Sequence, residues 1–331
     1  MKKRLLPYLL AVVCLFQVCE VFGQEKISFF TPVDTFSKSR FWGLTGSAAA
    51  GYTGVVIGLN ELWYAQFDRR NFHFFNDGAE WKDMDKMGHL FTAYFQSKWA
   101  MHAYRWAGLN RRASVWAGVA AGTLFQSTLE VMDGFSSEWG FSFYDVAFNT
   151  AGVTLMASQE WLWQEQRIIL KMSAHRPNYS TSPLVAYNSE ATTTLDARAA
   201  ELYGTNFAEV AIKDYNGLTV WASANISSFI RKKDTWVPDW LNIAIGYGAE
   251  NLYGGFSNAW DDDDGNIFIA RTSQYPRYRQ YYLGFDVDFT RIKTRHRSLK
   301  FLFTLLNVVK VPSPTLEVNT LGKVKFHPLY F

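Results

Sequence analysis

The chain has 331 residues and a net charge of +3, with 33 basic side chains against 30 acidic ones. This balance leaves no large basic block of the kind that binds nucleic acid, so we expect no nucleic-acid partner. Aromatic residues make up 17% of the chain and include 13 Trp. Such enrichment is typical of proteins that meet a membrane interface, because Trp and Tyr rings have one apolar and one polar end.

The amino-terminal segment, residues 1–23, has the pattern of a cleavable secretory signal peptide. Basic residues 2–4 precede an apolar stretch over 5–18, and Gly23 supplies a small residue before the expected cleavage point. The apolar stretch is shorter than the roughly 20 residues that a membrane helix needs. We therefore expect an exported protein that lies in the periplasm or at the outer membrane rather than in the inner membrane.

The positions of the two cysteines exclude cysteine chemistry from the expected mature chain. Both Cys14 and Cys19 lie within the predicted signal peptide, so we expect no disulfide, no thiolate nucleophile and no cysteine metal site. Val18 stands before Cys19 at a place where a lipoprotein signal carries a small residue, so lipidation is not expected. Residues 24–40 then form an N-terminal arm.

Residues 41–174 carry long uncharged stretches at helical spacing and predict a module of about four helices. These helices either cross a bilayer or form the core of a compact bundle. Basic residues gather at one end of the bundle, called side A, and acidic residues at the other end, called side B. The expected helices cover residues 41–60, 84–106, 112–132 and 143–170.

The remainder of the chain has a different texture. Residues 175–212 begin with a stretch rich in Ser, Thr, Asn and Pro and form a linker with a short helix. Residues 213–331 alternate in short polar and apolar steps and predict five to seven strands, most clearly at 281–290 and less clearly at 219–230 and 241–249. The predicted fold class is α+β: a membrane-associated helical bundle followed by a β-rich region.

Polar residues recur at helical spacing on three of the four predicted helices, always at side B. Residues three or four apart share one helix face, so each helix directs its polar residues to one side. Carboxylates and a histidine near an apolar bundle cost free energy unless they are paired, which makes them candidates for function. The candidate catalytic or binding cluster, with roles unassigned, is Asp85, His89, Glu130, Asp133, Asp145 and Asn149.

The motifs around this cluster resemble a known family. They are DKMGH at 85–89, EVMDGF at 130–135 and DVAFNTAG at 145–152. Over roughly residues 80–160 the pattern is similar to the predicted periplasmic lipoproteins that include enterobacterial YfiM, and more distantly to the VanZ-like membrane proteins. The resemblance implies an envelope location and a helical, membrane-associated core, and it supplies no established reaction. The β-rich region looks like the extension of the Bacteroidetes members.

Two interpretations of the cluster remain open. In a structural network, Asp145 caps the fourth helix, Asp85 lies in the first turn of the second, and His89 pairs with Glu130 or Asp133. In a ligand or catalytic site, His89 and the carboxylates hold a divalent cation, or His89 acts as a general base. The pattern favours the structural network, and it favours a metal cofactor least.

The common enzyme motifs give no further direction. The chain contains no HExxH, no Gly-x-Ser-x-Gly, no P-loop and no dinucleotide fingerprint, so no nucleotide cofactor is expected. We predict an envelope protein with a structural or binding role, whose partner is membrane lipid or another envelope component. The alternative is an envelope hydrolase that acts on a lipid-linked or glycan substrate at side B, with or without a metal.

Overall fold

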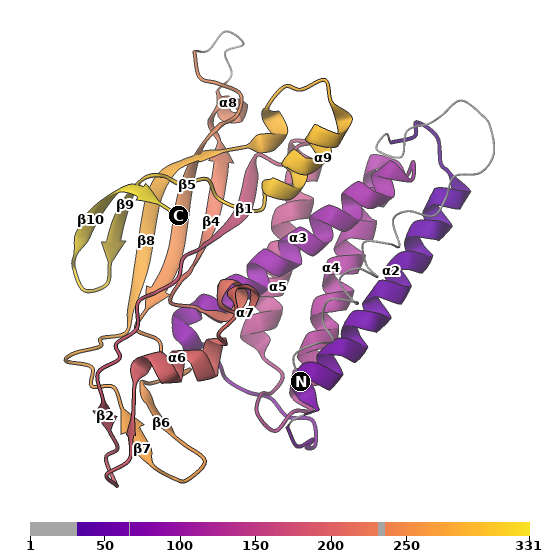
Figure 1. The fold of residues 1–331 in the computed structure, drawn as a ribbon. Helices are drawn as coiled ribbons and strands as arrows, with labels where there is room; N and C mark the ends of the chain where they lie inside the picture. The colour runs from indigo at the N-terminus through magenta and orange to yellow at the C-terminus, as the bar shows by residue number, and fades with distance from the viewer. Residues whose placement is uncertain (1–31, 66, 231–235) are drawn as a thin grey trace.

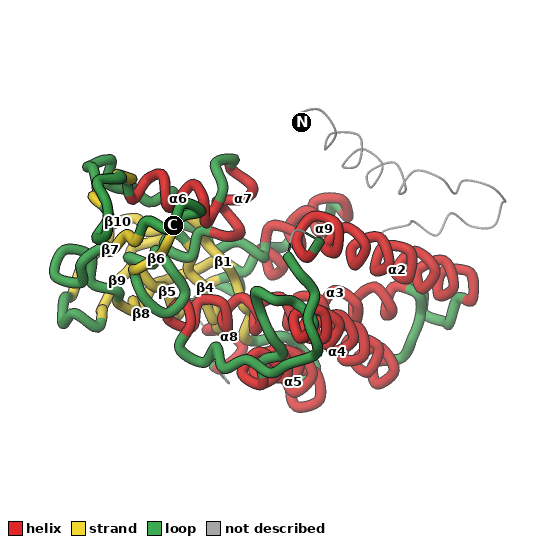
Figure 2. The backbone as a smooth tube through the Cα atoms, turned by 90° about the horizontal axis from the view of Figure 1, so that it is seen from below, coloured by secondary structure: helices red, strands yellow, loops and turns green. Residues whose placement is uncertain are grey.

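The computed structural model describes residues 32–65, 67–230 and 236–331, so the predicted signal peptide lies outside the described residues. Helices gather on one side of the molecule and strands on the other (Figures 1 and 2). Four long helices precede the β-rich region, which confirms the predicted α+β class. Within the described ranges, none of the helices combines the length and the apolar character that crossing a membrane would require.

The four long helices lie close to their predicted bounds. Three of them begin after a side chain that accepts a backbone N–H bond and so caps the helix: Ser37, Asn110 and Ser142. Ser142, rather than Asp145, therefore caps the fourth helix. The helices are α2 (Lys38–Leu59), α3 (Met84–Trp106), α4 (Arg111–Gly134) and α5 (Phe143–Leu162), with a π-helical turn η1 (Asn60–Tyr64) after α2 and a 3-10 turn η2 (Glu80–Asp83) before α3.

The fourth helix is shorter than predicted, because the chain turns at residue 164 and continues as strand β1 (Ile168–Ala174). Gln164 adopts a positive φ of 62°, which ends the helical path. The side-chain oxygen of Gln159 then accepts bonds from the backbone N–H groups of Arg167 and Ile168, at 2.9 and 2.7 Å. These bonds fix the turn, and the β-branched pair at 168–169 favours a strand.

Glycines allow α3, α4 and α5 to approach closely. A Cβ at Gly118 of α4 would lie 2.5 Å from the carbonyl oxygen of Ser97 on α3. A Cβ at Gly152 of α5 would lie 2.3 Å from the carbonyl oxygen of Leu90, also on α3. Both distances are shorter than any real contact allows, so the three helices pack backbone against backbone around α3.

The main sheet has six strands, all antiparallel, in the order β1-β4-β5-β8-β9-β10. β5 nearly coincides with its prediction, whereas β4 ends earlier than predicted and β8 is shifted by three residues toward the amino terminus. The strands after β1 are β4 (Leu218–Asn225), β5 (Leu241–Glu250), β8 (Tyr278–Val287), β9 (Ser313–Asn319) and β10 (Val324–Tyr330).

Short elements occupy the connections. Two small hairpins bring the number of strands in the described residues to ten. Seven of these strands, β4 to β10, lie within residues 213–331, which agrees with the five to seven predicted there. The hairpins are β2 (Leu184–Val185) with β3 (Thr192–Thr193) and β6 (Ala259–Asp261) with β7 (Ile267–Ile269). The short helices are α6 (Leu195–Tyr203), α7 (Phe207–Lys213), α8 (Ile226–Phe229), η3 (Phe289–Arg291) and α9 (Arg297–Leu306).

The helices and the sheet share one apolar core. Phe91, Tyr94 and Phe95 of α3 and Met156 of α5 pack in the same buried cluster as sheet residues. The sheet contributes residues from its first two strands, Ile169, Leu170 and Val220. The bundle therefore lies directly against the β1–β4 side of the sheet, with side B of the bundle near the end of the sheet where β5 finishes.

Candidate functional site

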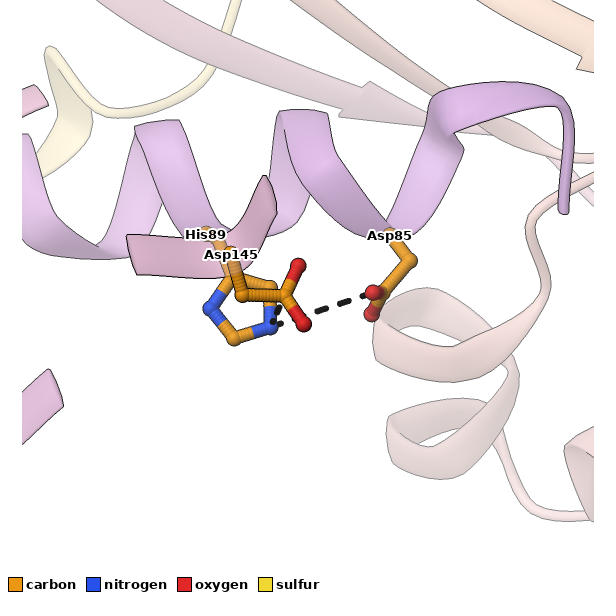
Figure 3. A group of neighbouring side chains, drawn as sticks. All are labelled: Asp85, His89 and Asp145. Carbon is orange, nitrogen blue, oxygen red and sulfur yellow. Dashed lines mark ion pairs between the residues drawn. The ribbon is translucent and has the colours of Figure 1, made fainter. Parts of the chain in front are cut away.

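The candidate cluster lies where α3 and α5 begin and α4 ends. Asp85 is in the first turn of α3, and His89 follows it one turn later on the same face. Asp145 is in the first turn of α5 and Asn149 one turn further. Because α4 runs antiparallel to both helices, its last turns bring Glu130 to the same end. Figure 3 shows Asp85, His89 and Asp145 converging from two helices.

His89 is at the centre of the cluster. Its Nε2 atom lies 3.8 Å from Oδ2 of Asp85 and 3.6 Å from Oδ1 of Asp145. Its Nδ1 atom lies 3.1 Å from Oδ1 of Asn149 and 3.5 Å from Oε1 of Glu130. Five of the six predicted residues are thus brought together around one imidazole ring, at side B as expected.

The orientation of the imidazole follows from its hydrogen bonds. Asn149 donates from Nδ2 to Oε1 of Glu130 at 3.2 Å, so its Oδ1 atom is left to accept a bond from Nδ1 of His89. Glu130 and Asn149 together assign the Nδ1 atom of His89 as a donor. Nε2 then faces two carboxylate oxygens at distances longer than a hydrogen bond.

Asp133 takes a different partner. The hydroxyl of Tyr64, in η1, donates to Oδ1 of Asp133 at 2.7 Å. Burial raises the pKa of Asp133 to about 6, and the Tyr64 bond and nearby His89 oppose that rise. Asp133 therefore ties the end of α4 to the turn after α2, beside the ring of contacts around His89.

Lys86 and Asp77 belong to the site, although helical spacing did not single them out. Lys86 is only 1% exposed, and its Nζ atom lies 2.6 Å from Asp77, 2.9 Å from Asp85 and 2.7 Å from Asp145. Ser142 donates a further hydrogen bond to Asp77 at 2.5 Å. Lys86 lies in the same sequence motif as Asp85 and His89, and this adjacency could have indicated that it belongs to the site. Asp77 lies in a loop, where no periodicity marks it.

The cluster holds more acids than bases, and its pKa values reflect this. Burial raises the pKa of Asp145 to about 8 and that of Glu130 to about 7. Burial opposes protonation of His89, but nearby Asp85, Asp145 and Glu130 raise its pKa above the usual value. The same kind of attraction raises the pKa of Lys86. The site therefore favours bound positive charge, as protons or as a cation.

Two buried oxygens of the cluster lack a hydrogen bond among the described residues: Oε2 of Glu130 and Oδ1 of Asp145. Lys86 lies within ion-pair distance of the Asp145 oxygen, but their geometry is not that of a hydrogen bond. A buried acceptor without a partner costs roughly 1–3 kcal/mol, more when it is charged. The arrangement thus leaves acceptor capacity for a further positively charged group.

Comparison with known proteins gives one match. Residues 73–159 match the model of a family described as "Predicted periplasmic lipoprotein (DUF2279)", and this segment contains every residue of the candidate cluster. The match confirms the predicted similarity to that family and supports an exported envelope protein. The narrower likenesses, to YfiM and to the VanZ-like proteins, stay predictions.

No curated protein matches the chain. No solved structure matches it either.

Proposed function

We propose that this exported protein binds a divalent cation between His89, Asp85 and Asp145. The observation that carries the proposal is the spacing around Nε2 of His89, which faces the two carboxylate oxygens at 3.6 and 3.8 Å. Donor atoms that share one ion at about 2.0–2.2 Å lie roughly 3–4 Å apart. One donor atom from each of the three residues fits within 4.8 Å of the other two, which supports a common ion.

The donor set indicates which cation fits. One imidazole nitrogen with two carboxylate oxygens suits a transition-metal ion such as Zn²⁺ or Mn²⁺ better than Ca²⁺, which prefers oxygen alone. The hydrogen bonds from His89 to Asn149 and from Asn149 to Glu130 resemble the outer contacts that orient a metal-bound imidazole.

Lys86 places a positive charge beside the carboxylates of the proposed site. Its ammonium group contacts the same oxygens of Asp85 and Asp145 that face His89. It therefore neutralises part of the acidic charge before a metal arrives and lowers the affinity that the carboxylates alone would give. The ion in turn displaces the proton that the carboxylates favour on His89.

We limit the proposal to binding. The pocket of about 480 Å³ beside this end of the bundle is lined by residues of α2, η1, α4 and the following loops, among them Tyr64, Val131 and Phe135. None of the six candidate residues lines that pocket, so no observation favours the hydrolase alternative.

The test is equilibrium dialysis of the purified protein against Zn²⁺ and, separately, Mn²⁺, with the bound metal measured by mass spectrometry. We expect the wild-type chain to retain one ion of at least one of the two metals. We expect His89→Ala and Asp145→Asn to weaken its binding at least about tenfold. The control is His102→Ala, which removes an exposed histidine from the same helix and should leave binding unchanged.

Folding of each variant is checked by circular dichroism, so that lost binding is not confused with lost structure. The proposal is wrong if the wild-type chain retains neither metal, or if folded His89→Ala binds as tightly as the wild type.

A further inference from the structure

Four strands of the main sheet, β5, β8, β9 and β10, expose apolar side chains on one face. Along β8, Tyr281, Leu283 and Phe285 are exposed, whereas the alternating residues Tyr282 and Asp286 are buried. An antiparallel sheet with one face toward water normally shows the reverse, with apolar residues inside and polar residues outside. The outward face of this sheet therefore requires an apolar neighbour.

The apolar face is continuous across four strands. Ile245 of β5 pairs with Leu283 of β8, which pairs with Leu316 of β9, which pairs with Phe326 of β10. These four residues are 63%, 46%, 39% and 67% exposed. Neighbouring strands lie about 4.8 Å apart, so this single row is about 14 Å wide. Rows on either side add further exposed apolar residues, namely Ile243, Phe285, Val318 and Val324.

The inward face explains why the apolar residues point outward. Lys171 of β1 and Asp286 of β8 form a fully buried ion pair at 2.8 Å. Glu317 of β9 is also buried and accepts a bond from Asn319 at 3.0 Å, with Nε2 of His327 2.8 Å away. Because these polar groups pair with one another inside, the sheet buries them without leaving them unpaired, and its apolar residues point outward.

The sheet also curls around this polar interior. The hydroxyl of Tyr330 on β10 lies 3.2 Å from the hydroxyl oxygen of Thr219 on β4, although β5, β8 and β9 separate the two strands. The apolar face is therefore convex. A convex face meets a second rigid convex copy over a small area, whereas fluid acyl chains can follow its curvature.

One end of the sheet is basic. The segment after β8 exposes Lys293, Arg295 and Lys300. Lys293 lies 3.3 Å from Asp239, just before β5, which places this segment at the end where β5 begins and β8 finishes. Side A of the bundle lies at the same end, since Arg111 bonds the carbonyl oxygen of Gln164 shortly before β1. In Figure 1 this is the upper end, which carries α8 and α9.

We propose that the convex outer face of β5, β8, β9 and β10 docks into the acyl-chain region of a lipid bilayer. The basic end then contacts anionic phosphate headgroups. Apolar burial supplies the affinity, and exposed Lys and Arg side chains add attraction that depends on salt and on the anionic lipid content. This docking does not depend on the proposed cation site, because it uses other residues on another part of the fold.

The test is co-sedimentation of the purified protein with vesicles of phosphatidylcholine and phosphatidylglycerol in equal parts. The main variant carries Ile245→Thr, Leu283→Thr and Phe285→Thr together. Thr is well tolerated in strands, so the sheet is expected to form. We expect this variant to partition into vesicles at least about tenfold less than the wild type, because three apolar side chains no longer enter the lipid.

The matched control replaces three exposed apolar residues at the other end of the molecule, Tyr187→Thr, Phe256→Thr and Ile267→Thr, and should partition like the wild type. A second variant, Lys293→Glu with Arg295→Glu and Lys300→Glu, should bind the mixed vesicles at least about tenfold more weakly than the wild type. It should match the wild type on vesicles of phosphatidylcholine alone. His89→Ala should bind vesicles normally, which separates this result from the metal test.

The docking proposal is overturned if the wild-type protein stays in the supernatant, or if the folded triple Thr variant sediments with vesicles as the wild type does. A wild-type dimer in light scattering that the same Thr variant abolishes, without vesicle binding, would instead assign the face to a second copy of the chain.

Discussion

Lys98 of α3 carries its ammonium group into the interior without a carboxylate partner among the described residues. Nζ lies 5.6 Å from the ring centre of Tyr94 and 5.5 Å from that of Phe95, so the ammonium group lies over aromatic faces. Burial lowers the pKa of this lysine to about 8. Lys171, which is equally enclosed, has Asp286 beside it. Lys98 is therefore the buried lysine whose charge is least compensated in the helical core.

We expect Lys98→Met to stabilise the protein at pH 7. In the unfolded chain the lysine has its ordinary pKa of 10.5, above the folded value of about 8. Between these pH values the unfolded state binds more protons, so wild-type stability rises as the pH increases through this window. Met removes the part of this pH dependence that Lys98 contributes, and it removes the cost of burying the charge, which is on the order of 3 kcal/mol at most.

The measurement is urea unfolding from pH 7 to pH 10.5, with Lys323→Met at an exposed turn as the control. An unchanged slope of stability against pH in Lys98→Met would contradict the expectation.

At the scale of single residues, the sequence predicted the helical members of the cluster. Asp85 with His89, and Asp145 with Asn149, stand four apart and so had to share a helix face. Lys86 was out of reach of this reasoning, because a long flexible side chain can place its charge beside the neighbouring face. Asp77 was also out of reach, because its position depends on how a loop folds back onto the helix ends.

At the scale of elements, α4 packs against α3 too closely to admit a larger side chain at one glycine. Gly118 faces the backbone of α3 so closely that a Cβ there would lie 2.5 Å from a carbonyl oxygen. Gly51 on α2 also lies within a helix, but a Cβ there would meet nothing within 4 Å. Both glycines lie within a helix, but only Gly118 is packed against a neighbouring backbone.

We expect Gly118→Ala to destabilise the protein by about 1–3 kcal/mol, because α3 and α4 must move apart. Gly51→Ala should be neutral or stabilising by up to about 1 kcal/mol, because alanine has the higher helix propensity. Thermal and urea unfolding of both variants checks the pair. Equal effects of the two substitutions would show that the close approach of α3 and α4 does not limit stability.

Two features of the helices and strands could not be predicted from the sequence, namely the end of α5 and the direction of the polar face of β8. Uncharged stretches predicted the four helices well, but the end of α5 depends on the side chain of Gln159 binding a backbone eight and nine residues away. The alternation along β8 predicted a strand with one polar face. Alternation alone cannot tell which of the two faces of a strand points into the protein. In β8 the polar face points inward.

For the molecule as a whole, the helices and the sheet depend on one core. Met156 of α5 and Leu170 of β1 belong to the same buried cluster as Val220 of β4. An apolar cluster with members from both parts couples their stabilities, because neither part can open without exposing it.

We therefore expect one cooperative unfolding transition. Helical circular dichroism and tryptophan fluorescence should report the same midpoint, and Met156→Ala should lower both together, by about 2–5 kcal/mol of stability. Thr304→Ala on exposed α9 is the control and should shift neither signal. Two separate midpoints would mean that the bundle and the sheet unfold independently.

The outward apolar face of the sheet also constrains where the chain can finish folding. Strands that pair in water would leave Ile245, Leu283 and Phe326 exposed on a surface that promotes association between chains. An exported chain that reaches lipid before its strands pair avoids that hazard, because the apolar residues are covered as the sheet forms. For such a chain, arrival at the lipid surface is a step of folding as well as of transport. While the chain crosses the aqueous compartment, association between unfolded chains competes with correct folding.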